Sequence, residues 1–244
     1  MITQYRAPEP APALKDLTER VRFEGTEGKI WLDEQRMLLV QAATMASMRR
    51  ELIEMLGVER AKGFFLRLGY QSGLKDAELA RKLRPNGNPV DMFFIGPQLH
   101  SLKGMVKVRP LQLEIDLDNG HFYADIEWQD SFEVENCQQE NLQSEQPICW
   151  MLLGYASGYT SAFMGRMVLF KETECACCGA NNCRIVGKPV EEWEDGEQYA
   201  RYFEPDSRIA YLPSAAWAGV AQHDAKLQRR VLGLHARDDR PNRK

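Results

Sequence analysis

The amino-acid sequence predicts an α+β fold, and three features support this class. Apolar residues recur at helical spacing through residues 33–57. Strict alternation of apolar and polar residues marks residues 111–117 and 122–128, on either side of an Asp118-Asn119-Gly120 turn. A hydrophobic content of 44% over 244 residues is enough for one sizeable core with loosely attached ends.

The N-terminal half predicts a hairpin and then three helices. Residues 1–16 are polar and Pro-rich, which indicates a flexible lead-in. Asp33 is a suitable N-cap for the first helix and Gly57 a suitable stop. In the second helix we expect Gly63, Gly69 and Gly73 to cause a break or a bend. The expected elements are a hairpin over residues 21–32, turning near residues 25–28, and helices over residues 33–57, 58–83 (ended by Pro85) and 90–103.

The C-terminal half predicts a helix rich in small residues, followed by two strands. Pro147 can open this helix, in which Tyr155 and Tyr159 lie on one face. Its small residues permit close approach of a neighbour, namely Gly154, Ser157, Gly158 and Ser161. The expected segments are a polar loop over residues 133–146, a helix over 147–165, strands over 167–170 and 183–187, a terminal helix over 190–203, and a divergent or disordered tail over 206–244.

The charge and the apolar runs exclude several classes of protein. A formal net charge of −4 argues against direct nucleic-acid binding, because such affinity rests on Lys and Arg that neutralise phosphates. Eighteen consecutive apolar residues occur nowhere, and the N-terminus lacks the apolar stretch of a secretory signal. We therefore expect a cytoplasmic protein without a membrane span. In that reducing compartment six cysteines are more often metal ligands or buried thiols than disulfides.

A cysteine cluster over residues 172–183 indicates a metal centre. Four thiols and two carboxylates fall within these twelve residues, and Cys149 lies on the preceding predicted helix. Zinc suits soft thiolate ligands, and a structural zinc site needs four donors. Cys175 and Cys178 form a C-x-x-C pair, although no second such pair follows at finger distance. The spacing leaves open a redox pair, inert thiols, a carboxylate ligand and the choice between Cys177 and Cys178, while Cys137 is expected to be a bystander.

Several strings resemble one family across residues 17–205. These are Glu27-Gly-Lys-Ile-Trp31, Gly57-Val-Glu-Arg-Ala-Lys-Gly-Phe-Phe-Leu66, Gly69-Tyr-Gln-Ser-Gly73, Asp76-Ala-Glu-Leu-Ala-Arg-Lys-Leu-Arg-Pro85, Gly187-Lys-Pro189 and Glu191-Glu-Trp193. They look like the N-terminal effector domain of the bacterial phenol- and xylene-responsive activators that depend on an alternative sigma factor.

The resemblance implies a vinyl-reductase-like ligand-binding domain with an N-terminal hairpin and a dimerising segment. It also implies a homodimer that controls a downstream ATPase module. No G-x-x-x-x-G-K-[ST] loop or helix-turn-helix is present in the sequence, so the ATPase and DNA-binding modules of a full-length regulator would lie outside it. Carried over residue by residue, the resemblance implies one zinc held by Cys149, Glu172, Cys175 and Cys183.

The implied effector is phenol or a methylphenol, and the implied contacts to it are His100 and Trp128. An indole N–H can only donate to the phenol oxygen, whereas a neutral imidazole can accept the phenol proton. Aromatic and aliphatic residues are candidates for the apolar wall, although residues at such spacing are more often simple core. These candidates are Phe93, Phe122, Ile126, Tyr155, Tyr159 and Phe170.

Two other functions compete with this interpretation. A zinc-dependent enzyme acting on a small aromatic substrate would need an open metal position, with Glu172 or Glu174 as general base. A pure interaction module would instead expose a methionine stripe formed by Met37, Met45, Met48 and Met55.

Overall fold

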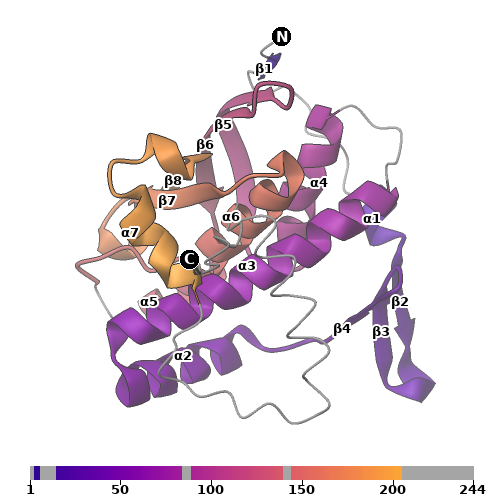
Figure 1. Cartoon of the computed structure of the whole chain (residues 1–244). Helices are drawn as coiled ribbons and strands as arrows, with labels where there is room; N and C mark the ends of the chain where they lie inside the picture. Colours follow the sequence, from indigo (N-terminus) through magenta and orange to yellow (C-terminus); the bar gives the residue numbers. More distant parts are fainter. Residues whose placement is uncertain (1–2, 6–14, 84–88, 140–143, 205–244) are drawn as a thin grey trace, which may run out of the picture.

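A computed structural model of the chain describes residues 3–5, 15–83, 89–139 and 144–204. Its main sheet has five antiparallel strands in the order β1-β5-β6-β8-β7, and a separate three-stranded sheet has the order β2-β3-β4. The mixed fold confirms the predicted α+β class (Figure 1). The strands are β1 (Thr3–Tyr5), β2 (Val21–Glu24), β3 (Lys29–Leu32), β4 (Gln35–Met37), β5 (Lys107–Asp116), β6 (His121–Gln129), β7 (Val168–Glu174) and β8 (Cys183–Pro189).

Helices cover the main sheet in layers. The long helix α3 crosses the molecule in front of α6, and β2, β3 and β4 project to one side of both (Figure 1). The α-helices are α1 (Lys15–Thr18), α2 (Ala42–Leu56), α3 (Val58–Leu83), α4 (Pro89–Leu102), α5 (Phe132–Gln139), α6 (Trp150–Met164) and α7 (Gly196–Ala200). Short 3-10 turns are η1 (Gly25–Glu27), η2 (Ala176–Cys178), η3 (Val190–Glu192) and η4 (Arg201–Phe203).

The backbones of α3 and α6 pack against each other through glycines. A Cβ atom added at Gly73 would lie 2.3 Å from the Tyr155 carbonyl oxygen, and one at Gly158 would lie 2.1 Å from that of Tyr70. Gly69 and Gly154 make equally close contacts. The expectation that glycines break residues 58–83 is therefore wrong, because α3 is continuous and the missing side chains admit the neighbouring helix. The predicted close approach by small residues of α6 is confirmed.

The helix predicted from Asp33 begins nine residues later, at Ala42. Asp33 adopts a left-handed φ of 54° in a tight turn, and Leu32 on one side pairs with Gln35 on the other. This turn adds β4 to the predicted hairpin and forms the three-stranded sheet. Aspartate tolerates the left-handed region better than most residues, which explains why the turn replaces a helix start.

Three further expectations differ from the structure. Residues 132–139 of the expected polar loop form α5, and the expected terminal helix over residues 190–203 is divided into η3, α7 and η4. Residues 3–5, inside the expected lead-in, pair with β5 as β1. The methionine stripe is not an exposed face, since Met37, Met45 and Met48 pack partly buried against the core and only Met55 is exposed. The expectations for Pro85 and for the tail over residues 206–244 lie outside the described residues.

The helices of the described ranges were also compared with what a bilayer requires. None of them combines the length and the apolar character needed to cross a membrane.

Candidate functional site

A buried cavity of about 30 Å³ lies between α4, α6 and the main sheet. Its wall is mostly aromatic and aliphatic, and its residues come from four strands and two helices. Seven of the eight residues predicted to contact an effector line it, namely Phe93, His100, Ile126, Trp128, Tyr155, Tyr159 and Phe170. Sequence reasoning therefore selected residues that the fold brings to one place.

His100 is the polar group that distinguishes this cavity from ordinary core. It is only 2% exposed, and its Nε2 atom is buried without a hydrogen-bond partner among the described residues. Its ring stacks on Tyr155 at a centroid distance of 3.7 Å and lies 6.2 Å from the ring of Trp128. Burial holds the pKa of His100 well below its ordinary value, and the nearby Lys103 ammonium lowers it further. The imidazole is therefore neutral at pH 7, and one ring nitrogen can accept a proton donor.

The two tyrosines of α6 present their rings, rather than their hydroxyls, as cavity wall. Tyr155 donates its hydroxyl to Asp76 at 2.6 Å, and Tyr159 donates to the Met92 carbonyl at 2.8 Å. Their rings lie nearly parallel, with centroids 6.2 Å apart, as expected from their spacing on one helical face. Because both hydroxyls are already satisfied, these residues supply apolar surface.

Phe122 is the one predicted contact that does not line the cavity. It packs behind the wall, with its ring centroid 5.5 Å from that of Phe93 and 6.0 Å from that of Phe170. Inward direction on a strand does not distinguish the innermost row from the row behind it, so Phe122 lies one layer behind its expected place. Sequence reasoning also missed six lining residues: Gly96, Pro97, Val108, Ala156, Thr160 and Ile185.

Strand pairing explains two of these missed residues. Val108 pairs with Trp128 across β5 and β6, and Ile185 pairs with Ile126 across β6 and β8. Directly opposite residues share a sheet face, so each recognised residue of β6 brings its partner to the cavity. The β5–β6 register follows from the Asp118-Asn119-Gly120 turn and was accessible from the sequence. The pairing with β8 is long-range and was not.

A cluster of four acidic donors lies at the ends of the same elements. The ligand atoms of Cys149, Glu172, Cys175 and Cys183 all fall within 4.8 Å of one another. The Cys149 and Cys183 sulfurs are 3.7 Å apart, and the Glu172 Oε1 atom is buried with no hydrogen-bond partner in the described part of the chain. These are the four residues that the family resemblance implies as ligands. An unpaired carboxylate oxygen beside three thiols fits a cation-binding site.

The pKa values of these donors reflect their burial beside one another. Burial raises the pKa of Glu172 to about 8, and the neighbouring Cys175 adds to this rise. Burial also raises the pKa of the Cys149 thiol well above its ordinary value, whereas hydrogen bonds from Cys149 and Cys183 lower that of Cys175. A bound cation would favour the deprotonated form of all four donors.

The other two thiols of the cysteine segment have different surroundings. Cys178 is exposed, while Cys177 forms a disulfide with Cys137 of α5 across 40 residues of sequence. Cys137 is therefore not the bystander that was expected. Neither Cys177 nor Cys178 belongs to the four-donor cluster, so the geometry favours Cys175 where the spacing left a choice.

The cluster and the cavity share their supporting elements. β7 carries Phe170 of the wall and Glu172 of the cluster, and β8 carries Ile185 and Cys183. Helix α6 begins directly after Cys149, its N-cap. A cation in the cluster would therefore fix three elements that form the wall of the cavity.

Comparison with known proteins gives this arrangement a family. A family model described as "Activator of aromatic catabolism" matches residues 16–116, and the model of the vinyl-reductase-type domain matches residues 124–189. The crystal structure of the phenol-responsive sensory domain of the transcription activator PoxR with phenol is 46% identical, with a TM-score of 0.77. The match covers 79% of this chain and 96% of the PoxR chain.

The chain belongs to the activators of aromatic catabolism. This confirms the family resemblance and the vinyl-reductase-like fold predicted from the sequence. Among these activators, the transcriptional regulatory protein XylR of Pseudomonas putida is 58% identical over 193 residues, which cover 79% of this chain and 34% of XylR. The phenol regulator MopR of Acinetobacter guillouiae is 46% identical over 194 residues, or 80% of this chain and 35% of MopR. The chain thus spans about a third of the length of these curated relatives.

Proposed function

We propose that this domain senses phenol or a related small aromatic effector, such as a methylphenol, inside the buried cavity. Occupancy relieves repression of a downstream ATPase module in a transcription activator of aromatic catabolism. The observation that carries the proposal is the Nε2 atom of His100, unpartnered among the described residues, buried in an aromatic cavity and close to Trp128. The phenol-bound PoxR domain and the name of MopR support the same class of effector.

The recognition chemistry uses both capacities of a phenolic hydroxyl. The neutral His100 imidazole accepts the phenol proton, and the Trp128 indole N–H donates to the phenol oxygen. Phe93, Ile126 and Phe170 pack against the ring, together with the two tyrosine rings of α6. An effector without a hydroxyl would leave both buried polar groups unpaired, which costs about 1 to 3 kcal/mol for each group.

We assign a structural zinc ion to Cys149, Glu172, Cys175 and Cys183. Zn–S bonds of about 2.3 Å place two sulfurs of a tetrahedral site about 3.8 Å apart, close to the 3.7 Å between Cys149 and Cys183. Four protein donors leave no position for an activated water, so the alternative of a zinc-dependent enzyme acting on a small aromatic substrate is disfavoured. The role of the metal is to hold β7, β8 and the start of α6 around the cavity.

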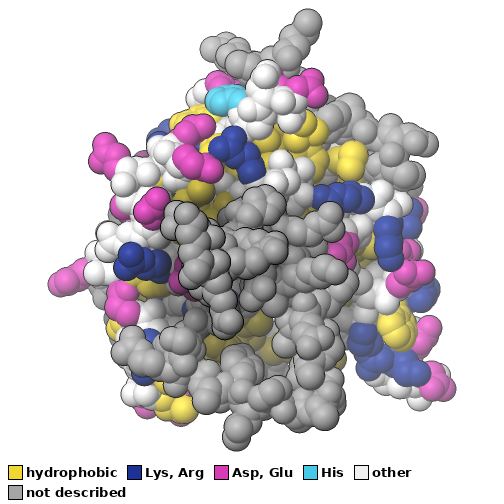
Figure 2. Space-filling view, in the orientation of Figure 1, with side chains coloured by type: hydrophobic (Ala, Val, Ile, Leu, Met, Phe, Trp, Pro, Cys, Tyr) yellow, Lys and Arg dark blue, Asp and Glu magenta, His cyan; other side chains and the backbone are white. Residues whose placement is uncertain are grey.

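The assembly we propose is a homodimer in the cytoplasm. Large apolar side chains are exposed around the three-stranded sheet and the segment before α2, including Phe23, Leu38, Leu39 and Val40 at 53–79% exposure. They border an apolar groove of about 650 Å³. Figure 2 shows hydrophobic side chains among charged ones over this side of the molecule. A contiguous apolar surface of this kind is typical of a protein–protein interface.

The test is calorimetric titration of the 244-residue chain, assayed for zinc, with phenol and with toluene. We expect micromolar binding of phenol, about −8 kcal/mol, near the limit of what about seven heavy atoms can supply. His100→Ala should weaken phenol binding about 5-fold to 150-fold, in proportion to the lost polar contact, and should affect toluene far less. Equal binding of the two ligands by wild type and variant would refute the recognition chemistry.

A further inference from the structure

A buried ion pair lies directly behind the cavity wall. Asp76 of α3 and Lys103, the residue after α4, place Oδ2 and Nζ 2.5 Å apart, with their side chains only 2% and 14% exposed. The same Asp76 oxygen accepts the Tyr155 hydroxyl at 2.6 Å, and the Tyr155 ring stacks on His100. Neither Asp76 nor Lys103 lines the cavity. The pair is nevertheless one contact away from the proposed recognition group.

Entry of an aromatic ring requires some part of the wall to move. The cavity measures about 30 Å³, whereas a cavity that binds benzene measures about 150 Å³. Helices α3 and α6 cannot absorb the change, because their glycines already bring the two backbones into contact. Close-packed interiors transmit such displacements rather than damp them.

Helix α4 is the part of the wall that is held least firmly. It supplies Phe93, Gly96, Pro97 and His100 to the cavity, and the Nε2 edge of His100 makes no hydrogen bond to the described residues that would resist movement. The ion pair of Lys103 with Asp76 ties the C-terminal end of α4 to the rigid α3–α6 pair. An effector that displaces α4 therefore acts on this tie.

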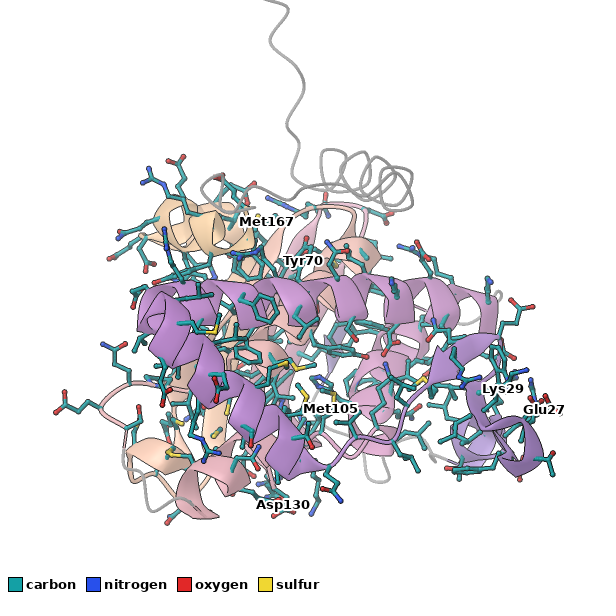
Figure 3. All side chains as sticks on the ribbon, turned by 90° about the horizontal axis from the view of Figure 1, so that it is seen from below. Glu27, Lys29, Tyr70, Met105, Asp130 and Met167 are labelled. Atoms are coloured by element: carbon teal, nitrogen blue, oxygen red, sulfur yellow. A yellow bond between two sulfur atoms is a disulfide. The ribbon has the colours of Figure 1, made fainter. Side chains whose placement is uncertain are left out.

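The far side of the tie faces the apolar groove. Lys103, Gly104 and Met105 line the groove together with residues of β2, β3, β4 and the start of α2. In Figure 3 α3 runs across the view, Met105 lies beneath it, and the β2–β3 hairpin, marked by Glu27 and Lys29, lies at one end. A shift of the α4 end changes one wall of this groove.

We propose that the Asp76–Lys103 ion pair couples the aromatic cavity to the apolar groove, so that movement of α4 on effector binding alters the groove surface. Asp76 and Lys103 are positioning residues that act through Tyr155 and α4. The inference rests on the proposed function, and it adds the route by which occupancy reaches an interaction surface.

The experiment combines calorimetry with hydrogen exchange on the 244-residue chain, with phenol as the probe. In the wild type we expect phenol to change exchange rates in residues 21–45 by about threefold or more, a measurable shift in local opening. The double variant Asp76→Asn with Lys103→Met removes both charges together, which avoids an unpaired buried charge. It should bind phenol within about threefold of wild type and show no phenol-dependent change in residues 21–45.

Three further variants make the result specific. Lys103→Arg keeps the ion pair and should retain the phenol-dependent change. Lys82→Met removes an exposed ion pair with Glu34 and should also retain it. If the double variant does not fold, Lys103→Gln is the milder substitution and should reduce the change by at least about half, since a neutral hydrogen bond is roughly half as strong as a charge-assisted one.

Two results would overturn the inference. In one, the double variant or Lys103→Gln binds phenol and transmits the full exchange change. In the other, the wild type binds phenol without any change in residues 21–45. A wild type that gives no calorimetric signal with phenol would instead refute the proposed function itself.

Discussion

Replacing Ile126 by alanine should exchange stability for a wider effector range. Ile126 is 5% exposed on β6, lines the cavity, and pairs with Ile185, which lines it too. The substitution removes three carbon atoms from a wall that glycine-packed helices prevent from collapsing. The existing cavity of about 30 Å³ then becomes large enough for a ring with additional methyl groups.

The expected magnitudes follow from burial and mass action. A buried Ile→Ala substitution costs about 2 to 5 kcal/mol, and we expect about 3 kcal/mol here because the cavity cannot collapse. A dimethylphenol at about 100 times its dissociation constant restores about 2.7 kcal/mol to a protein that binds it only when folded. The liganded variant should therefore nearly recover the stability of the free wild type.

Urea denaturation with and without dimethylphenol measures both quantities. Ile115→Ala is the matched control, since Ile115 is 3% exposed on β5 and does not line the cavity. It should lose similar stability and gain no affinity for dimethylphenol. If Ile126→Ala and Ile115→Ala respond identically to the ligand, the cavity is not the effector site.

Three other outcomes follow from the structure. Cys175→Ser should lose bound zinc and Cys178→Ser should keep about one equivalent by plasma emission spectrometry; equal metal contents would refute the ligand assignment. The pKa of His100 is lowered by folding, so its contribution to stability is present above pH about 6.5 and lost below it. Relative to His100→Gln at equal zinc loading, wild type should lose about 1 kcal/mol between pH of about 6.5 and 5.5 in urea titrations; parallel curves would contradict this. Gly158→Ala places a Cβ atom 2.1 Å from the Tyr70 carbonyl oxygen and should cost about 2 kcal/mol in the same assay; an unchanged midpoint would show that the helices can separate.

Local signals predicted much of the fold, and tertiary packing decided the rest. The alternation around Asp118-Asn119-Gly120 predicted β5 and β6 correctly because turn and period agree. At Asp33 a suitable N-cap preceded apolar residues at helical spacing, yet residues 38–40 are exposed and the chain turns into β4. Helix propensity likewise gives no information about Gly69 and Gly73, whose role depends on a helix about 80 residues away.

The candidate site divides in the same way. Seven cavity residues and the four-donor cluster were named from the sequence, but through family resemblance rather than spacing. Spacing alone could not separate Cys175 from Cys177, because the donors come together only when β7, β8 and α6 meet. The Cys137–Cys177 disulfide and the Asp76–Lys103 pair join distant segments and leave no local signal.

Nitrogen NMR of the indole and imidazole groups during a phenol titration tests the central claim most directly. The chain has five tryptophans, and Trp128→Phe assigns the indole resonance of interest. We expect phenol to shift the Trp128 Nε1–H and the His100 Nε2 resonances together, at the concentration where calorimetry reports binding. Saturable binding that leaves both resonances in place, and moves instead the indole of Trp150 in the open cleft beside α7, would contradict the account.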